Sequence, residues 1–165
     1  KLENPFRSLL KPSFIFSDTK KKLRAMVVED IPFNAHINQE YLTKCGVSVV
    51  NWSMNGKDAV EFYQQEISEG REINLILMDI EMPIMDGKEA TRLIRKFEED
   101  QIAQNSSFRE AEVIFLSGNC LAKEIAECLD PQGQIRGNQF LRKPATLEDI
   151  KKAIQEKKAK NSFVG

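Results

Sequence analysis

The sequence has little cysteine and histidine, and neither residue type is arranged for redox or zinc chemistry. The closest pair of its three cysteines, Cys120 and Cys128, matches neither a CxxC motif nor the usual spacing of zinc ligands. With Cys45 they form an odd set, which predicts reduced, structural thiols and therefore a cytoplasmic location. The single histidine, His36, is expected to be a packed or solvated side chain.

The chain also lacks an excess of charge of one sign, long apolar runs and a glycine-rich loop. Its 24 Lys and Arg against 25 Asp and Glu leave no basic field for nucleic acid or an anionic membrane. The longest apolar runs, such as Ile73 to Met78, have the length of a strand, and the first residues do not resemble a secretory signal. No glycine-rich phosphate loop follows the first apolar run, which argues against nucleotide binding. We therefore expect a protein with no nucleic acid and no direct membrane contact.

What the chain has is a regular alternation of short apolar runs and helical patterns. Its 165 residues, 41% hydrophobic, are enough for one domain with a buried core. Residues 1–22 mix proline, serine and lysine without a period and predict a linker, residues 23–160 predict the domain, and residues 161–165 a tail. The apolar runs are Leu23 to Val28, Val47 to Trp52, Ile73 to Met78, Val113 to Leu116 and Gln139 to Leu141.

Most of these runs are apolar on both faces, as expected for strands of a parallel sheet with helices on both sides. The segments between them have helical spacing of apolar residues, with start signals at Asn55 and at the Thr146–Asp149 capping box, and a stop at Gly46. Strand followed by helix, repeated with right-handed crossovers, predicts an α/β, doubly wound parallel sheet with five helices. The predicted buried stripes are Phe33, Ile37, Tyr41 and Cys45; Ala59, Tyr63 and Ile67; Ala90, Leu93, Ile94 and Phe97; and Leu147, Ile150 and Ile154, with a weaker helix from Leu121 to Leu129.

Polar side chains stand directly after four of the five predicted strands. Glu29 and Asp30 follow the first, Asp79 the third, Ser117 the fourth and Lys143 the fifth. Because the carboxyl ends of parallel strands meet at one edge of the sheet, we expect these groups to share a cleft.

Such a cleft has the parts that a phosphoryl transfer requires. Three neighbouring carboxylates repel unless a cation intervenes, and Mg2+ suits them because it accepts carboxylates and leaves positions for phosphate oxygens. Lys143 can pair with Asp79 and later with a phosphoryl oxygen, while Ser117 can donate a hydrogen bond. A carboxylate is an established nucleophile, giving an acyl phosphate. Asp79 is the predicted nucleophile because it follows the most apolar strand and opens a loop shaped by Pro83 and Gly87.

Four segments together make the chain similar to a known family over a range from about Leu23 to Lys158. It resembles a response-regulator receiver domain, and most closely the receivers of hybrid histidine kinases. The resemblance implies the flavodoxin-like strand order 2-1-3-4-5. The segments are Glu29-Asp30, Leu77-Met78-Asp79-Ile80-Glu81-Met82-Pro83-Ile84-Met85-Asp86-Gly87, Ser117-Gly118-Asn119 and Phe140-Leu141-Arg142-Lys143-Pro144.

The resemblance also implies a role for each residue of the cleft. Asp79 is similar to the phosphorylated aspartate, and Lys143 to the lysine that pairs with the phosphate. Asp30 and Asp79 would ligate Mg2+ together with the backbone carbonyl of Glu81, while Glu29 would act largely through water.

Further implied roles concern the switch and the lifetime of the phosphate. Ser117 and Phe140 resemble the switch pair, in which the hydroxyl moves to the phosphate and the ring turns inward. The side chains of Glu81 and Asn119 border the path of the attacking water and are expected to tune phosphate lifetime. The bond before Pro144 is expected to be cis.

The predicted function is that of a phospho-accepting receiver in a two-component phosphorelay. Asp79 would take the phosphoryl group from a phosphohistidine of a histidine kinase or histidine-phosphotransfer protein, which switches partner binding and is followed by slow self-dephosphorylation. Whether the protein counts as an enzyme stays open: the chain is expected to catalyse only its own phosphorylation and dephosphorylation, but a parent chain that is a hybrid histidine kinase would be an enzyme. Two alternatives stay open: a docking module that is never phosphorylated, and an Asp-nucleophile phosphatase, although Glu81 stands where that class has a second aspartate.

The chain departs from the family pattern in two longer segments, residues 98–110 and 130–138. The resemblance places both beside the face that receivers use for output, so partner contacts there cannot be transferred from the family. A stand-alone relay protein and a fragment of a hybrid kinase both fit the sequence, and the linker-like start favours the fragment. The input signal, the output partner and the oligomeric state are not predicted.

Overall fold

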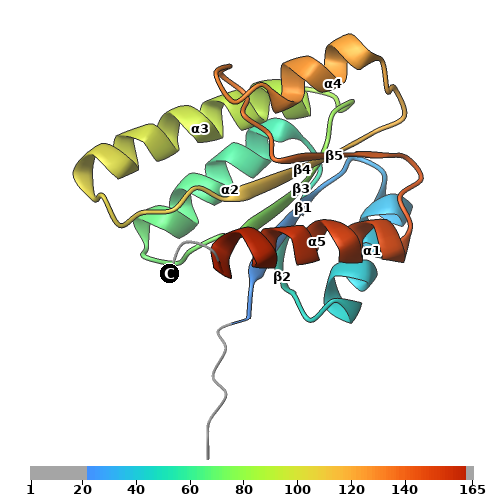
Figure 1. Ribbon diagram of the computed structural model, residues 1–165, viewed down its shortest axis with the longest axis horizontal. Helices are drawn as coiled ribbons and strands as arrows, with labels where there is room; N and C mark the ends of the chain where they lie inside the picture. The colour runs from blue at the N-terminus through green and yellow to red at the C-terminus, as the bar shows by residue number, and fades with distance from the viewer. Residues whose placement is uncertain (1–21, 163–165) are drawn as a thin grey trace, which may run out of the picture.

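The computed structural model describes residues 22–162, in which five strands alternate with five helices (Figure 1). The predicted linker, residues 1–22, lies almost entirely outside the described residues, and the last helix extends into the predicted tail. The strands are β1 (Arg24–Val28), β2 (Ser48–Ser53), β3 (Leu75–Asp79), β4 (Glu112–Ser117) and β5 (Gln139–Arg142). The helices are α1 (Pro32–Lys44), α2 (Gly56–Ser68), α3 (Gly87–Gln104), α4 (Ala122–Leu129) and α5 (Leu147–Ser162).

The strands form one parallel sheet in the order β2-β1-β3-β4-β5, which confirms the predicted fold. All residues of the central strand β3 are buried, as its apolar sequence on both faces requires. The sheet thus brings the ends of β1, β3 and β4 next to one another.

Helices cover both faces of this sheet (Figure 1), with α1 and α5 on one side and α2, α3 and α4 on the other. Each strand contributes to two cores, since alternate side chains point to opposite faces. Val27 packs in the core that includes Leu42 and Ile150, whereas Met26 packs in the core that includes Tyr63 and Ile94. Within residues 22–162, no helix has the length and apolar character needed to cross a bilayer.

The predicted start signals of two helices are confirmed. The Asn55 side chain accepts a hydrogen bond from the backbone N–H of Asp58 at the start of α2. At α5, Thr146 and Asp149 form the reciprocal capping box, each side chain accepting from the other residue's N–H. These caps fix where each helix begins after its strand.

The predicted buried stripe of α1 is only partly confirmed, since Tyr41 and Cys45 pack against the core but Phe33 does not. Phe33 is 72% exposed, and the buried residues of the helix are Ala35, Asn38 and Leu42. Residues four apart advance by more than one turn of 3.6 residues, so a series spaced by four drifts about 40° per step around the helix. The spacing from Phe33 to Cys45 therefore cannot stay on one face.

The polar segment 98–110 begins with a buried carboxyl group. Glu98 lies in α3 and is fully buried, where its carboxylate accepts hydrogen bonds from Tyr63 Oη (2.5 Å), Arg95 Nη1 (2.6 Å) and the N–H of Ala111 (2.7 Å). Burial raises the pKa of both Glu98 and Tyr63. These contacts join α2, α3 and the start of β4.

The two long segments contact each other through Arg136. Its guanidinium lies 2.8 Å from the Glu99 carboxylate and 3.1 Å from that of Glu110. The buried Arg95 donates to the carbonyl of Arg136 and to Asn138 Oδ1. Because α3 runs back from the carboxyl end of β3 to the beginning of β4, segment 98–110 lies at the end of the sheet opposite the predicted cleft.

Tyr63→Phe should lower the free energy of unfolding by about 1.5 kcal/mol, since it removes a hydrogen bond to a buried carboxylate. Urea denaturation followed by circular dichroism gives this value. The only other tyrosine, Tyr41, is half-buried on α1, so Tyr41→Phe is the matched control and should change the free energy much less. Equal effects of the two substitutions would contradict the assigned role of the network around Glu98.

Candidate metal and phosphoryl-transfer site

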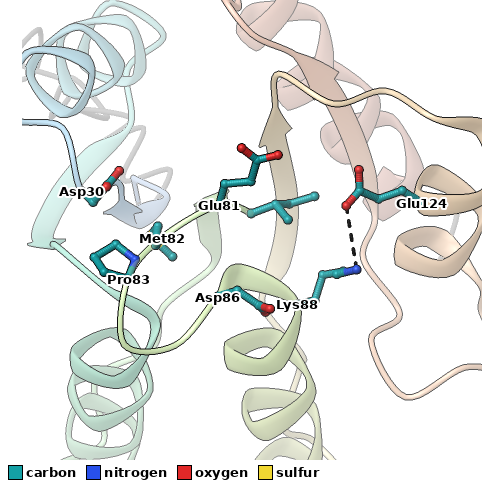
Figure 2. Close-up of a pocket in the computed structure, with 8 residues that line it drawn as sticks. Asp30, Glu81, Met82, Pro83, Asp86, Lys88 and Glu124 are labelled. Carbon is teal, nitrogen blue, oxygen red and sulfur yellow. Dashed lines mark ion pairs between the residues drawn. The ribbon is translucent and has the colours of Figure 1, made fainter.

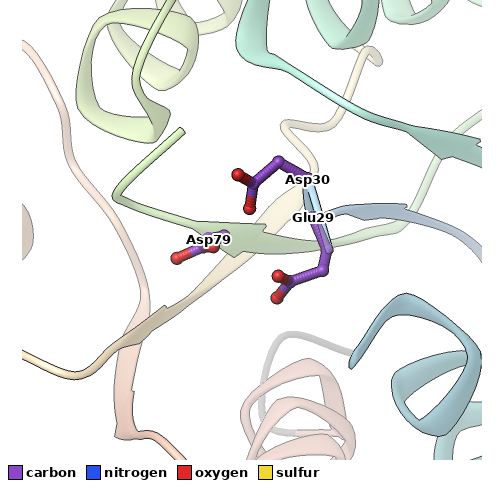
Figure 3. Close-up of side chains that lie close together, drawn as sticks. All are labelled: Glu29, Asp30 and Asp79. Carbon is purple, nitrogen blue, oxygen red and sulfur yellow. The ribbon is translucent and has the colours of Figure 1, made fainter. Parts of the chain in front are cut away.

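Three carboxylates converge at the carboxyl edge of the sheet, as the sequence predicts (Figure 3). Glu29 and Asp30 follow β1, and Asp79 ends β3; one carboxylate oxygen of each lies within 4.8 Å of the others. The register explains this, because Val28 pairs with Met78 and the next residues on both strands reach the same edge. Negatively charged oxygen donors are the ligands that a divalent cation such as Mg2+ prefers.

Lys143 reaches this cluster from the far side of β4. Its Nζ lies 2.6 Å from Asp79 Oδ2 and 2.8 Å from Glu29 Oε2. The backbone N–H of Lys143 donates to the carbonyl of Ser117, which fixes the start of this segment against β4. The peptide bond to Pro144 is cis, as expected. The predicted pairing of Lys143 with Asp79 is therefore present.

The electrostatics of the cluster are dominated by burial. Asp79 is only 3% exposed, and burial, with the charge of Glu29, raises its pKa to about 6 against the opposing effect of Lys143. Burial alone would lower the pKa of Lys143, but its bonds to Asp79 and Glu29 outweigh this and hold the pKa above its ordinary value. A cation beside Asp79 would favour its charged form at neutral pH.

Glu29 is fully buried and is held more tightly than the sequence suggested. Besides Lys143, its carboxylate accepts from the N–H of Ile31 and from Asn34 Nδ2, both at 3.3 Å. Its backbone carbonyl accepts from the indole N–H of Trp52 at 2.8 Å. Sequence reasoning missed Asn34 and Trp52, because neither follows a strand as the charged residues do. The only feature of the sequence that could have pointed to Asn34 was its position about one helical turn after the acid pair.

Ser117, Asn119 and Phe140 lie on the neighbouring strands and loop. Ser117 is buried at the end of β4, and its hydroxyl accepts a hydrogen bond from the N–H of Asn119 at 3.0 Å. Phe140 pairs in register with Phe115 on β4 and is half-buried against the core under α2, α3 and α4. The structure thus places the two predicted switch residues on adjacent strands, while their movement stays a prediction.

The loop after Asp79 forms a shallow pocket beside the carboxylates (Figure 2). The loop packs tightly at Gly87, where the Cβ atom of any other residue would lie 2.0 Å from the carbonyl oxygen of Asp79. Lys88 closes the far wall by pairing with two glutamates of α4, Glu124 at 3.8 Å and Glu127 at 3.2 Å. The pocket has a volume of about 480 Å3 and is lined by Asp30, Ile80, Glu81, Met82, Pro83, Asp86, Lys88 and Glu124.

Asp30 belongs to both the carboxylate cluster and this pocket, so an ion held by the cluster would face open space on the pocket side. The Glu81 side chain is exposed at the rim, and its N–H donates to Asp79 Oδ1 at 3.3 Å. The donor set therefore fits Mg2+, which binds one or two carboxylates and retains water or phosphate oxygens as further ligands.

Comparisons with known proteins agree with this geometry. The chain is 30% identical over 131 residues to the peroxide stress-activated histidine kinase mak1 of Schizosaccharomyces pombe, covering 79% of this chain but only 7% of the kinase. It is similar to a chain in the co-crystal structure of the Saccharomyces cerevisiae histidine phosphotransfer signaling protein Ypd1 with the receiver domain of its response regulator Ssk1. That match has a TM-score of 0.68 and 27% identity over 82% of this chain and 88% of the other.

A second solved structure is the receiver domain of sensor histidine kinase PA1611 from Pseudomonas aeruginosa, which has a magnesium ion in its active-site cleft. It matches with a TM-score of 0.64 and 27% identity over 82% of this chain and 96% of the other. The family model for the response regulator receiver domain matches residues 25–155, most of the chain. With the parallel sheet and the carboxylate cluster at its edge, this match shows that the chain belongs to the response regulator receiver domain family.

Proposed function

We propose that Asp79 accepts a phosphoryl group from a phosphohistidine of a partner protein, with Mg2+ as cofactor. The observation that carries the proposal is the joint position of Asp79 within the carboxylate cluster and 2.6 Å from the Lys143 ammonium. Asp30, Asp79 and the backbone carbonyl of Glu81 would hold the ion, and Glu29 would act on it through water. The magnesium ion in the cleft of the similar PA1611 receiver supports this assignment.

In the proposed transfer, a carboxylate oxygen of Asp79 forms the new P–O bond while the P–N bond to the histidine breaks. The leaving imidazole nitrogen takes a proton from solvent. Mg2+, when bound, offsets the negative charge that the carboxylates and phosphoryl oxygens would otherwise bring together. Lys143 keeps its bond to Glu29 and exchanges Asp79 for a phosphoryl oxygen, so its charge remains paired throughout.

The switch that follows involves Ser117 and Phe140. The Ser117 hydroxyl, which now accepts from Asn119, would turn to donate to a phosphoryl oxygen, and the half-buried Phe140 ring would move inward behind it. Phosphorylation then shifts an equilibrium between two arrangements of the region around α4, and so changes partner binding. Glu81 and Asn119, both exposed beside the cleft, would set how fast water removes the phosphate.

Exposed apolar side chains around the cleft support a protein as the phosphodonor. We call them the apolar rim: Ile31, Phe33, Trp52, Met54, Ile84 and Leu121. They lie at or just after the carboxyl ends of β1 to β4, and of the large exposed hydrophobic residues in the described part of the chain only Ile102 lies elsewhere. Ile84 is 80% exposed and is held at a φ of 71°, which is unfavourable for a β-branched residue. A small phosphodonor would not need this rim, whereas a helical histidine-bearing protein would bury it.

Phe33→Ser should slow phosphoryl transfer from a phosphorylated histidine-phosphotransfer protein about tenfold, because it removes a large apolar contact from the rim. Transfer of radiolabel from the phosphohistidine partner to this chain measures the rate. Uptake from acetyl phosphate should not change, because Phe33 lies outside the carboxylate cluster. Ile102→Ser, an equivalent change on the far end of α3, is the control; if it slows transfer as much as Phe33→Ser, the rim is not the docking surface.

The transfer is proposed to take place in the cytoplasm, with a histidine kinase or histidine-phosphotransfer protein as partner. Cys45, Cys120 and Cys128 form no disulfide in the described part of the chain, as expected of cysteines in a reducing compartment. Ypd1, bound to a receiver in the similar co-crystal structure, is a histidine phosphotransfer protein and supports the class of partner.

A further inference from the structure

Strand β2 holds the backbone of Glu29, the first residue of the acid pair, at both its N–H and its carbonyl group. The N–H of Glu29 donates to the carbonyl of Ser53 at 3.0 Å, which is the last rung between β1 and β2. The carbonyl of Glu29 accepts from the indole N–H of Trp52 at 2.8 Å. A side chain thus continues the hydrogen bonding between the two strands at the point where β2 ends.

This second bond acts on the peptide unit that joins Glu29 to Asp30. The plane of a peptide is rigid, so holding its carbonyl oxygen sets the direction in which the next Cα places its side chain. The Asp30 carboxylate is half-exposed, in contrast to the fully buried Glu29, and its place in the cluster therefore depends on its backbone.

We propose that Trp52 is a positioning residue for the magnesium site. Its N–H holds the peptide before Asp30, so that the Asp30 carboxylate is in place before the ion arrives. Without the donor, this peptide would have to be ordered when the ion binds, and part of the binding free energy would be lost to that ordering. The inference rests on the proposed function of the cleft, and it assigns to Trp52 a role separate from any contact of the apolar rim with a partner.

The test replaces one atom group without changing the shape of the side chain. Trp52 is the only tryptophan of the chain, so growth of a tryptophan auxotroph on β-(3-benzothienyl)alanine replaces this residue alone and puts sulfur where the N–H was. Fluorotryptophan introduced in the same way keeps the N–H and is the matched control. Isothermal titration calorimetry with MgCl2 at fixed pH and ionic strength gives the dissociation constant, and circular dichroism checks that each protein is folded.

The benzothienyl protein should bind Mg2+ about three- to tenfold more weakly than the wild type, the size expected for one net hydrogen bond, and the fluorotryptophan protein should bind as the wild type does. A merely structural role would lower the melting temperature and leave the dissociation constant unchanged, which would overturn the inference. If the benzothienyl protein does not fold, Trp52→Phe is measured in its place with the same expected result. Absence of Mg2+ binding in the wild type would overturn the proposed function itself, and the inference with it.

Discussion

Asp79→Asn should take up no phosphate from acetyl phosphate and Mg2+ under conditions that phosphorylate the wild-type chain. The substitution keeps the shape of the side chain but removes the carboxylate that forms the bond to phosphorus, so a loss of at least about a hundredfold is expected. Intact-mass spectrometry measures the uptake directly. Beryllofluoride, a mimic of the phosphoryl group, should likewise bind the wild type but not the variant.

A matched control separates the role of Asp79 from a general effect of lost negative charge. Asp100 is exposed on α3, far along the helix from the cleft, so Asp100→Asn should become phosphorylated as the wild type does. Equal phosphate uptake in wild type and Asp79→Asn would show that another residue accepts the group. No uptake in the wild type itself would instead favour a docking module that is never phosphorylated.

Lys143→Met should lower the free energy of unfolding at pH 7 by about 3 kcal/mol, because it leaves two buried carboxylates, Glu29 and Asp79, without their common cation. The difference in free energy of unfolding between the wild type and Lys143→Met should become smaller as pH falls. A carboxyl group whose folded pKa lies above its unfolded value contributes stability that is present below the unfolded pKa and is lost as pH rises through the folded one. The pKa of Asp79 is already about 6 with Lys143 beside it, and removing the lysine raises it further.

The measurement is urea denaturation of both proteins without Mg2+ between pH 5 and pH 8. The gap between them should be widest above about pH 6 and narrower at pH 5, where the Asp79 carboxyl is increasingly protonated. Lys96→Met changes an exposed lysine on α3 and should cost much less than Lys143→Met at every pH. A gap that does not vary with pH would mean that Lys143 stabilises the fold by packing alone. Adding Glu29→Gln to Lys143→Met should recover part of the loss.

Much of the cleft could be predicted from sequence because the residues that form it stand in a simple relation to the strands. Asp30, Asp79 and Lys143 each stand at the end of a strand or within two residues of it, and in a parallel sheet such positions must meet at one edge. The strand order itself came from the family resemblance. The positions were therefore available from local patterns, whereas the roles of Ser117, Phe140, Glu81 and Asn119 stay predictions.

What could not be predicted depends on contacts between residues far apart in the chain. Glu98 is a residue type usually found at the surface, yet it is fully buried, where Tyr63 from α2 and Arg95 one turn earlier donate hydrogen bonds to its carboxyl group. Trp52 touches Glu29 only because β2 lies beside β1 in register. On α1, apolar residues spaced by four suggested one face, and the drift of the helix turned Phe33 outward to the rim.

Every strand of this sheet is followed by a helix that runs back, so the described chain enters at β1 and leaves after α5 at the end of the sheet opposite the carboxyl ends of the strands (Figure 1). A fluorescent reporter or a surface anchor attached beyond either end of the described chain would start on the side of the sheet away from the cleft. The length of such a tether would then change the local concentration of a partner without covering the surface on which that partner acts. The points of attachment and the reactive cleft thus lie at opposite ends of the sheet, which makes the domain suitable for biosensors and immobilised assays.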